Sequence, residues 1–452
     1  MSGVTGTSMA GSAAPAAGSG TTPPPYVPGI SREGITARRK RNHRSELAIW
    51  WREIDRVLLF LIALLMAVGT LAVAAASPAS AVKLSDAKHH YEPMYFFTHH
   101  LMWQFFGVAL MLAVSQMSRD LARRAGVLLA AAMLVALMLV PVIGTDHNGA
   151  KRWLLGTSFQ PSEFLKPSFS IFLAWILSLR LRDATLPVMA MSTVMTGLVV
   201  VLLMLQPDFG SAVLFVSVWF VLLLLSGLPV KRIAMVGVAG LFGVVAAYLF
   251  YGNARNRIDA FLGGGTAYDQ VDIARHTLTA GGWTGTGLWL GTHKLSLPEA
   301  HTDYILSVIG EEFGLIACAL IVLLYLAVVA RVLRRLAHEE DLFTILAASG
   351  LVAQIGGQAF INILVNLQLF PSKGMTLPLI SYGGSSTVAL CIGVGFLLAL
   401  TRRNPFLARD PFARPLVVSG ARPAPASTQG ATTPRNTPRD KRGPGPDARV
   451  AS

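Results

Sequence analysis

The segment GGWTGTGLWLGTHKLSLPEAHTD, residues 281–303, closes a polar interval at 252–304 that separates two long apolar runs. Glycine tolerates sharp bends and lets the backbone approach other groups closely, so we expect this segment to fold down onto the protein. Its last residue, Asp303, stands where the next apolar run begins. An ionisable side chain at the boundary of a membrane span is a functional candidate by default. Asp303 is therefore the first candidate residue.

The composition places the chain among proteins that cross a membrane several times. Of 452 residues, 53% are hydrophobic and 14% are charged, and the mean hydropathy is +0.54, whereas a soluble domain carries about 25% charged residues. The formal charge of +14 does not indicate nucleic-acid binding, because residues 1–56 and 402–452 contribute +4 and +7 of it. Cys318 and Cys391 lie inside apolar runs, which favours two buried thiols over a disulfide.

Apolar runs near the roughly twenty residues that a bilayer requires recur along the chain. We expect an all-α polytopic membrane protein with ten transmembrane helices and a large extracytoplasmic loop between helices 7 and 8. The expected spans are 57–77, 95–116, 125–144, 161–179, 186–205, 209–227, 232–250, 304–330, 342–370 and 376–400. The first is interpreted as an uncleaved anchor, because it is too long for a signal peptide and starts far from the terminus.

Clusters of Lys and Arg in alternate connections predict the orientation. Because basic loops stay on the cytoplasmic side, both termini are expected in the cytoplasm. The expected domains are a disordered basic N-terminal tail at 1–53, a ten-helix membrane domain at 54–403 and a disordered C-terminal tail at 404–452. The tails lack the large apolar side chains that a folded core requires.

One connection on the opposite side, and the span that follows it, carry candidate residues. Lys151 and Arg152 precede a span, where they could bind a diphosphate or anchor the chain at the interface. Glu163 and Lys166 follow Pro161, which suits the first turn of a helix. Their spacing of three predicts that they pair on one face of the span. Such a pair could be structural or could take part in the chemistry.

Two further stretches interrupt the apolar pattern. The sequence Gln206-Pro207-Asp208 predicts either an irregular backbone lining a cavity or a tight turn between two helices. The stretch 371–386 contains Lys373, Ser381 and two adjacent glycines, and it overlaps the last expected span. Close helix packing through small residues is one interpretation, and an anionic head group beside Lys373 is the other.

Four blocks of the sequence resemble the signature stretches of the SEDS family, named for shape, elongation, division and sporulation. They are residues 148–166, 206–210, 281–314 and 371–386, and the similarity extends over about 54–405. The most specific stretches are LPEAHTD at 297–303, GEEFG at 310–314 and KGMTLPLISYGGSS at 373–386. The residues at 54–56, 76–78 and 300–303 make the chain more similar to the cell-division members than to the rod-elongation members.

The resemblance implies a ten-span membrane glycosyltransferase that polymerises lipid II into peptidoglycan glycan strands. It implies a catalytic acid at Asp303, a buried acid–lysine pair at Glu163 and Lys166, and a turn acid at Asp208. The implied partners are a class B penicillin-binding transpeptidase and other membrane proteins of the divisome, and the implied location is the bacterial cytoplasmic membrane at the division septum.

Chemistry of this kind places further demands on the site. The departing diphosphate carries negative charge, which Arg152, Lys373 or a divalent cation such as Mg²⁺ could stabilise. His301 is expected to be a hydrogen-bonding residue of the loop.

Other functions remain open at this point. A lipid II flippase would also need many spans, broken helices and charges within the membrane, and a scaffold that only recruits septal enzymes is a third possibility. Nucleotide binding is excluded, because the glycines at 281–287 follow no strand and lack the Gly-Lys-Ser/Thr ending of a phosphate-binding loop.

Overall fold

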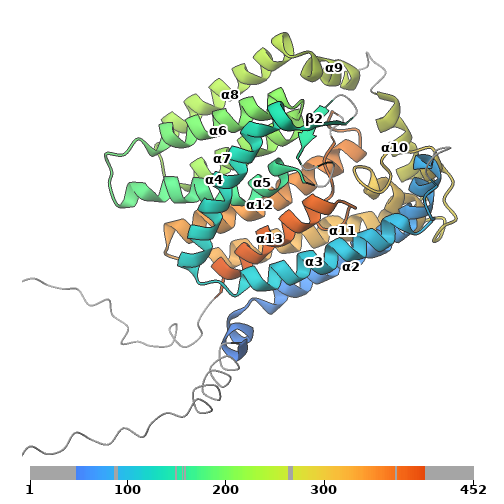
Figure 1. The fold of residues 1–452 in the computed structure, drawn as a ribbon, viewed down its shortest axis with the longest axis horizontal. Coiled ribbons are helices and arrows are strands. Elements are labelled where there is room, and N and C mark those ends of the chain that lie inside the picture. The colour runs from blue at the N-terminus through green and yellow to red at the C-terminus, as the bar shows by residue number, and fades with distance from the viewer. Residues whose placement is uncertain are drawn as a thin grey trace, which may run out of the picture. The chain divides into compact units, whose positions relative to one another are not determined.

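The computed structural model describes residues 47–85, 90–147, 150–154, 156, 159–262, 268–371 and 374–402. The chain there is almost entirely helical (Figure 1). The long helices are α2 (Arg56–Leu84), α3 (Tyr95–Ser115), α4 (Arg119–Ile143), α5 (Pro161–Ser178), α6 (Val188–Leu205), α7 (Phe209–Leu225), α8 (Val230–Phe250), α11 (Ile305–Leu336), α12 (Leu342–Asn366) and α13 (Gly384–Leu400). The expectations for the two tails fall mainly on residues 1–46 and 403–452, which lie outside the described residues.

Shorter elements connect these helices. They are the hairpin strands β1 (Thr145–His147) and β2 (Ala150–Trp153), the helices α9 (Gly252–Phe261) and α10 (Tyr268–Ala280), and the 3₁₀ turns η1 (Leu179–Leu181) and η2 (His293–Leu295). The two strands pair antiparallel. A helical segment at 47–53 precedes α2.

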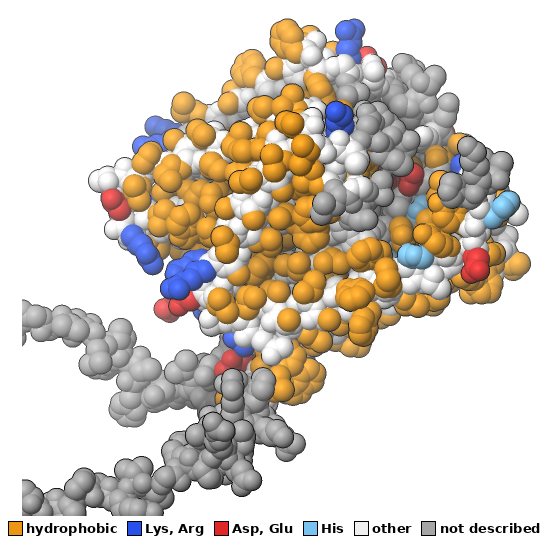
Figure 2. Space-filling view, viewed as in Figure 1, with side chains coloured by type: hydrophobic (Ala, Val, Ile, Leu, Met, Phe, Trp, Pro, Cys, Tyr) orange, Lys and Arg blue, Asp and Glu red, His pale blue; other side chains and the backbone are white. Residues whose placement is uncertain are grey.

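Eight of the described helices are long and apolar enough to cross a membrane, and α7 and α13 are shorter apolar helices of 17 residues each. The expectation of an all-α polytopic membrane protein is therefore confirmed. Figure 2 shows hydrophobic side chains over most of the visible helix surface, with charged side chains near its edges. A helical surface of this kind is suited to hydrocarbon rather than water.

Helices α5 and α12 form the centre of the bundle. They are the most buried of the candidate spans, and α12 packs against α5, α7, α11 and α13. Around them, α13 packs on α3, α4 on α5, and α2 on α11. This arrangement leaves the C-terminal end of α12 beside the start of α11, where the candidate residue Asp303 lies.

Several predicted boundaries differ from the structure; α11, for example, continues to Leu336 rather than ending at 330. Helix α2 continues to Leu84 rather than ending at 77, and α4 begins at Arg119, so that its basic residues lie in the helix and not in a connection. The last span begins at Gly384 rather than at 376. That prediction was wrong because Pro378 has no N–H to continue a helix, while the backbone at Leu379 has a positive φ of 63°.

The ends of the bundle away from Asp303 are held by ion pairs. Asp55 caps α2 and accepts hydrogen bonds from Arg331 near the end of α11, with Nε to Oδ2 at 2.9 Å. Burial acts to raise the pKa of the Asp55 carboxyl, but the hydrogen bonds and charges of Arg331 and Arg335 outweigh it and leave that pKa lowered. Arg119 at the start of α4 pairs with Glu339 beyond α11 at 3.0 Å.

Candidate functional site

Asp303 lies in a tight turn directly before α11. The amides of Thr302 and Tyr304 both donate to the carbonyl oxygen of Glu299, at 3.1 and 3.3 Å. Glu299 itself has a positive φ of 52°, which is uncommon for a residue with a side chain. The turn leaves Asp303 half-buried. A partly desolvated carboxylate at the end of a polar loop is a candidate proton acceptor.

The turn is hydrogen-bonded to the irregular segment 374–383. The Ser381 hydroxyl donates to the carbonyl oxygen of Thr302 at 2.6 Å, and the Tyr382 amide donates to that of His301 at 2.9 Å. A side chain on Gly374 would place its Cβ 3.3 Å from Oδ2 of Asp303. The structure therefore brings Ser381 and Asp303 into one site, as the sequence suggested. Lys373 lies outside the described residues.

His301 forms a hydrogen bond through its backbone, since its carbonyl oxygen accepts from the Tyr382 amide at 2.9 Å. Its ring is buried and lies against the rings of Phe96 and Tyr382, with centroids 4.3 and 5.3 Å away. Among the described residues its Nδ1 has no hydrogen-bond partner. Burial lowers the pKa of His301 to about 4, against a smaller opposing effect of the Glu299 charge. The His301 ring is therefore uncharged and packs as an aromatic side chain against Phe96 and Tyr382.

Sequence reasoning missed a row of buried amides on α12. Gln354, Gln358, Asn362 and Asn366 recur every fourth residue, and all four are buried. Residues four apart share one helix face, so the spacing within an otherwise apolar span was the available signal. Asn362 and Asn366 donate to the carbonyl oxygen of Asp303 at 2.8 and 3.3 Å. The row of amides on α12 thus extends to the candidate site.

Sequence reasoning also left Glu311 and Glu312 of α11 without a role. Both are buried. Glu312 pairs with the ammonium group of Lys294 and accepts from the amide of Trp289. Glu311 accepts from the amides of His293 and Lys294 at 2.7 and 2.9 Å. These contacts fasten the loop before Asp303 to the first half of α11.

Glycines allow this close approach. Helix α11 is interrupted at Gly314, whose φ is +85°, and a Cβ there would collide with the carbonyl oxygen of Trp283. A Cβ on Gly285, also at φ +85°, would collide with the carbonyl oxygen of Glu312. Only glycine adopts such a backbone at no steric cost. The prediction that the glycine-rich loop folds down onto the protein is confirmed.

The predicted pairing of Glu163 and Lys166 is present in α5. Pro161 occupies the first turn of this helix, and Lys166 Nζ lies 2.6 Å from Glu163 Oε1. Lys166 is buried and lines a small cavity together with Gln354. The amide row of α12 therefore begins beside this pair and ends beside Asp303.

Arg152 and Asp208 lie at the turn between α6 and α7. Arg152 donates through Nε to the carbonyl oxygen of Gln206 at 3.0 Å and through Nη2 to that of Pro207. Asp208 caps α7 by accepting from the Ser211 amide at 3.1 Å. The tight inter-helix turn is thus the correct alternative for this stretch. Lys151 is exposed on β2.

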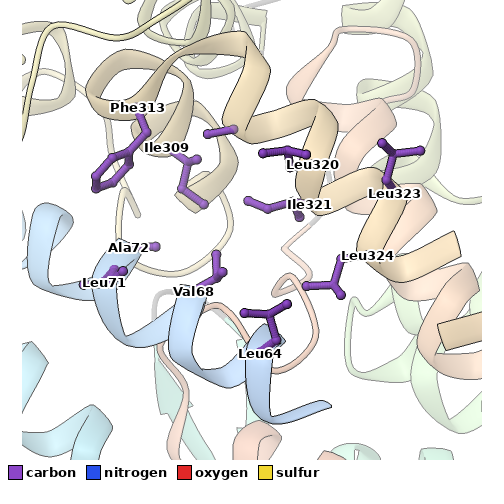
Figure 3. A pocket seen from close by; sticks show the side chains of 11 residues that line it. Leu64, Val68, Leu71, Ala72, Ile309, Phe313, Leu320, Ile321, Leu323 and Leu324 are labelled. Carbon is purple, nitrogen blue, oxygen red and sulfur yellow. The ribbon is translucent and has the colours of Figure 1, made fainter. Parts of the chain in front are cut away.

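One cavity among the described residues is apolar and separate from Asp303. It has a volume of about 510 Å³ and lies between α2 and α11 (Figure 3). Its lining is Leu64, Val68, Leu71, Ala72, Ile309, Phe313, Ala317, Leu320, Ile321, Leu323 and Leu324. With no polar side chain it cannot hold reacting sugars. In the part of the chain that the structure describes, no three His, Cys, Asp or Glu side chains gather to hold a metal ion.

Fold and site together define a polytopic membrane protein in which a loop acid lies in a turn whose backbone is held by the packed helices. Comparison with known proteins identifies the family of this chain. The sequence profile described as "Cell cycle protein", covering FtsW, RodA and SpoVE, matches residues 55–405. The chain belongs to this FtsW/RodA/SpoVE family.

The curated relatives agree with the cell-division branch. A protein of Caulobacter vibrioides named "Probable peptidoglycan glycosyltransferase FtsW" is 36% identical over 372 residues, covering 81% of this chain and 93% of that protein. Another of that name from Xanthomonas oryzae pv. oryzae is 38% identical over 327 residues, covering 68% of this chain and 66% of that protein. The greater resemblance to FtsW is confirmed.

Two solved structures share the fold. A chain from the work "Structural coordination of polymerization and crosslinking by a peptidoglycan synthase complex" is 28% identical with a TM-score of 0.63, covering 77% of this chain and 97% of that one. The Thermus thermophilus rod shape determining protein RodA is 28% identical with a TM-score of 0.56, covering 78% of this chain and 97% of that one.

Proposed function

We propose that this chain polymerises lipid II into peptidoglycan glycan strands, with Asp303 as the general base. The relatives are named peptidoglycan glycosyltransferases, and this chain is an enzyme of that class. The observation that carries the residue assignment is the held turn. Asn362 of α12 bonds to the Asp303 carbonyl oxygen, Ser381 bonds to that of Thr302, and Gly374 lies next to the Asp303 carboxylate. A base must be held in one geometry to act efficiently.

The reaction requires a proton acceptor and positive charge near the departing diphosphate. A sugar hydroxyl of one lipid-linked disaccharide attacks the anomeric carbon of another, and undecaprenyl diphosphate departs. Asp303 accepts the hydroxyl proton, an effect worth about 10²–10⁴-fold in rate. The diphosphate gains stabilisation from nearby cations, for which Lys151 and Lys373 are the proposed side chains and Mg²⁺ a further source. Arg152 is less suited, since its guanidinium already binds two carbonyl groups.

The proposed topology follows from the substrate and the helices. Ten helices cross the membrane, including α7 and α13, and the large loop between α8 and α11 connects the seventh and eighth on the outer side. Both termini lie in the cytoplasm, as the basic connections indicate. The protein then presents Asp303 to lipid II displayed on the outer face of the bacterial cytoplasmic membrane, at the division septum.

The proposed partner is a class B penicillin-binding transpeptidase, which would crosslink the growing strand. The structural match to a chain of a peptidoglycan synthase complex supports it. Further membrane proteins of the divisome are expected to recruit the pair to the septum.

A lipid II flippase is the alternative, and the buried pair of Glu163 and Lys166 favours it, because ionisable groups within a bundle mark transport paths in many proteins. A scaffold without activity would leave that pair unexplained. Purified protein with its transpeptidase partner and labelled lipid II in detergent separates these functions. We expect glycan polymer, which needs no bilayer; its absence under conditions where lipid II is bound would favour the flippase.

A further inference from the structure

Asn362 of α12 contacts both backbone segments that form the site. Its Nδ2 lies 2.8 Å from the carbonyl oxygen of Asp303 and 2.7 Å from that of Met375. Asn362 is almost fully buried, at 2% exposure. The Asn362 side chain therefore links the turn that carries Asp303 to the segment 374–383.

The surrounding bonds fix the orientation of this amide. Both bridged atoms are carbonyl oxygens, which only accept, so the group that faces them must be the NH₂ group. The Oδ1 atom of Asn362 accepts from Asn366 Nδ2 at 3.2 Å, and Asn366 Oδ1 accepts from the Ser307 hydroxyl at 2.8 Å. Each amide thus has partners for donor and acceptor, and the bridge cannot flip without losing several bonds.

The next amide along the row extends the same attachment. Gln358 Nε2 donates to the carbonyl oxygen of Thr376 at 2.9 Å. The segment 374–376 is thus held by two consecutive amides of α12, while the turn is held by Asn362 and Asn366. Of these described amides, Asn362 is the one that bonds to both segments, and it acts alongside the direct bonds from Ser381 and Tyr382 to the turn.

We infer that Asn362 is a positioning residue for Asp303, which fixes the carboxylate against the segment 374–383 while touching no substrate itself. This inference rests on the proposed function, in which Asp303 is the base. Without both donors of Asn362, the carbonyl oxygens of Asp303 and Met375 lose their common anchor. The bonds from Ser381 and Tyr382 remain, but the turn shifts relative to the segment at Asp303. Displacement of a reacting group by about 1 Å can cost about 10²-fold in rate.

The test compares Asn362→Leu, which keeps the volume and removes both donors, with Asn362→Ser, which leaves space for water to bridge. Purified variants are assayed for glycan polymerisation with the transpeptidase partner, and for backbone hydrogen exchange. We expect Asn362→Leu to lower kcat by about 10–100-fold with KM unchanged, and Asn362→Ser to fall between it and the native protein. The Tyr382 amide, protected by the His301 carbonyl, should exchange faster in Asn362→Leu.

The matched control is Ser349→Ala, another buried polar position on α12, which should leave kcat and Tyr382 exchange unchanged. Native kcat in Asn362→Leu would overturn the inference. So would a loss of kcat with unaltered Tyr382 exchange, which would show that the rate falls without movement of the turn. If the native protein makes no polymer, the proposed function fails instead, and the exchange measurement still decides whether Asn362 holds the turn.

Discussion

Lys294, in the loop before the site, and Glu312, in the first half of α11, form an ion pair that is almost wholly removed from solvent, with side-chain exposures of 4% and 0%. The Lys294 ammonium also donates to the carbonyl oxygen of Ala75 in α2 at 3.1 Å. The pair therefore joins the loop to two helices. Because Asp303 lies between Lys294 and Glu312 in the chain, this bond limits how far the site can move.

Neutralising one member of this pair should destabilise the protein. Removing one partner leaves a buried charge uncompensated, at a cost of about 3–5 kcal/mol. We expect Lys294→Met and Glu312→Gln each to lower the Tm in detergent, and the double variant to recover part of the loss. Thermal unfolding of the three purified variants is the measurement. Additive losses in the double variant would show that the two side chains do not depend on each other.

The same comparison can be made for a second buried pair, Glu163 and Lys166. There it also tests whether the pair takes part in the chemistry. We expect Glu163→Gln and Lys166→Met each to reduce folded yield, and the double variant to regain part of it, because removing one partner of a buried pair leaves a charge uncompensated. Folded yield and polymerisation rate per folded molecule are measured together. Equal loss of rate in all three variants at native Tm would instead assign the pair to the chemistry.

The contact between Gly374 and the Asp303 carboxylate predicts a sensitive position. Gly374→Ala should lower the polymerisation rate about tenfold while leaving Tm unchanged, because the new methyl group would lie 3.3 Å from Oδ2 and displace either the carboxylate or its substrate. The control is Gly197→Ala in α6, where a Cβ meets nothing within 4 Å. A native polymerisation rate in Gly374→Ala would show that the added methyl group displaces neither the Asp303 carboxylate nor its substrate.

The buried neutral His301 predicts a pH dependence of stability. Its pKa is lowered to about 4 from an ordinary value of 6.5, so the unfolded chain binds a proton between these values and the folded protein does not. Stability should therefore be complete above about pH 6.5 and fall as the pH drops toward 4. His301→Phe, which keeps the packing against Phe96 and Tyr382, should flatten this decline. Unfolding midpoints across that pH range test it; identical slopes for both proteins would contradict the buried neutral ring.

Much of the fold was readable from the sequence because membrane helices are long apolar runs. The clustering around Asp303 was only partly readable. The resemblance indicated Asp303, and Ser381 was a candidate within the stretch 371–386, but the contacts that join them depend on packing. Residues 376–383 were predicted as the start of the last span because their composition is apolar, whereas Pro378 and the strained backbone at Leu379 make them irregular. The amides of α12 gave a visible spacing, but their partners are carbonyl oxygens, which no side-chain pattern reveals.

The central claim is that Asp303 is the base for glycan polymerisation, and one rate comparison tests it most directly. Native protein and Asp303→Asn are purified with the transpeptidase partner, checked for equal Tm and partner binding, and given labelled lipid II in detergent. The substitution keeps the size of the side chain and removes its basicity. We predict that Asp303→Asn loses at least about 100-fold in the rate of strand formation. Long glycan strands formed at a rate close to native would contradict the account.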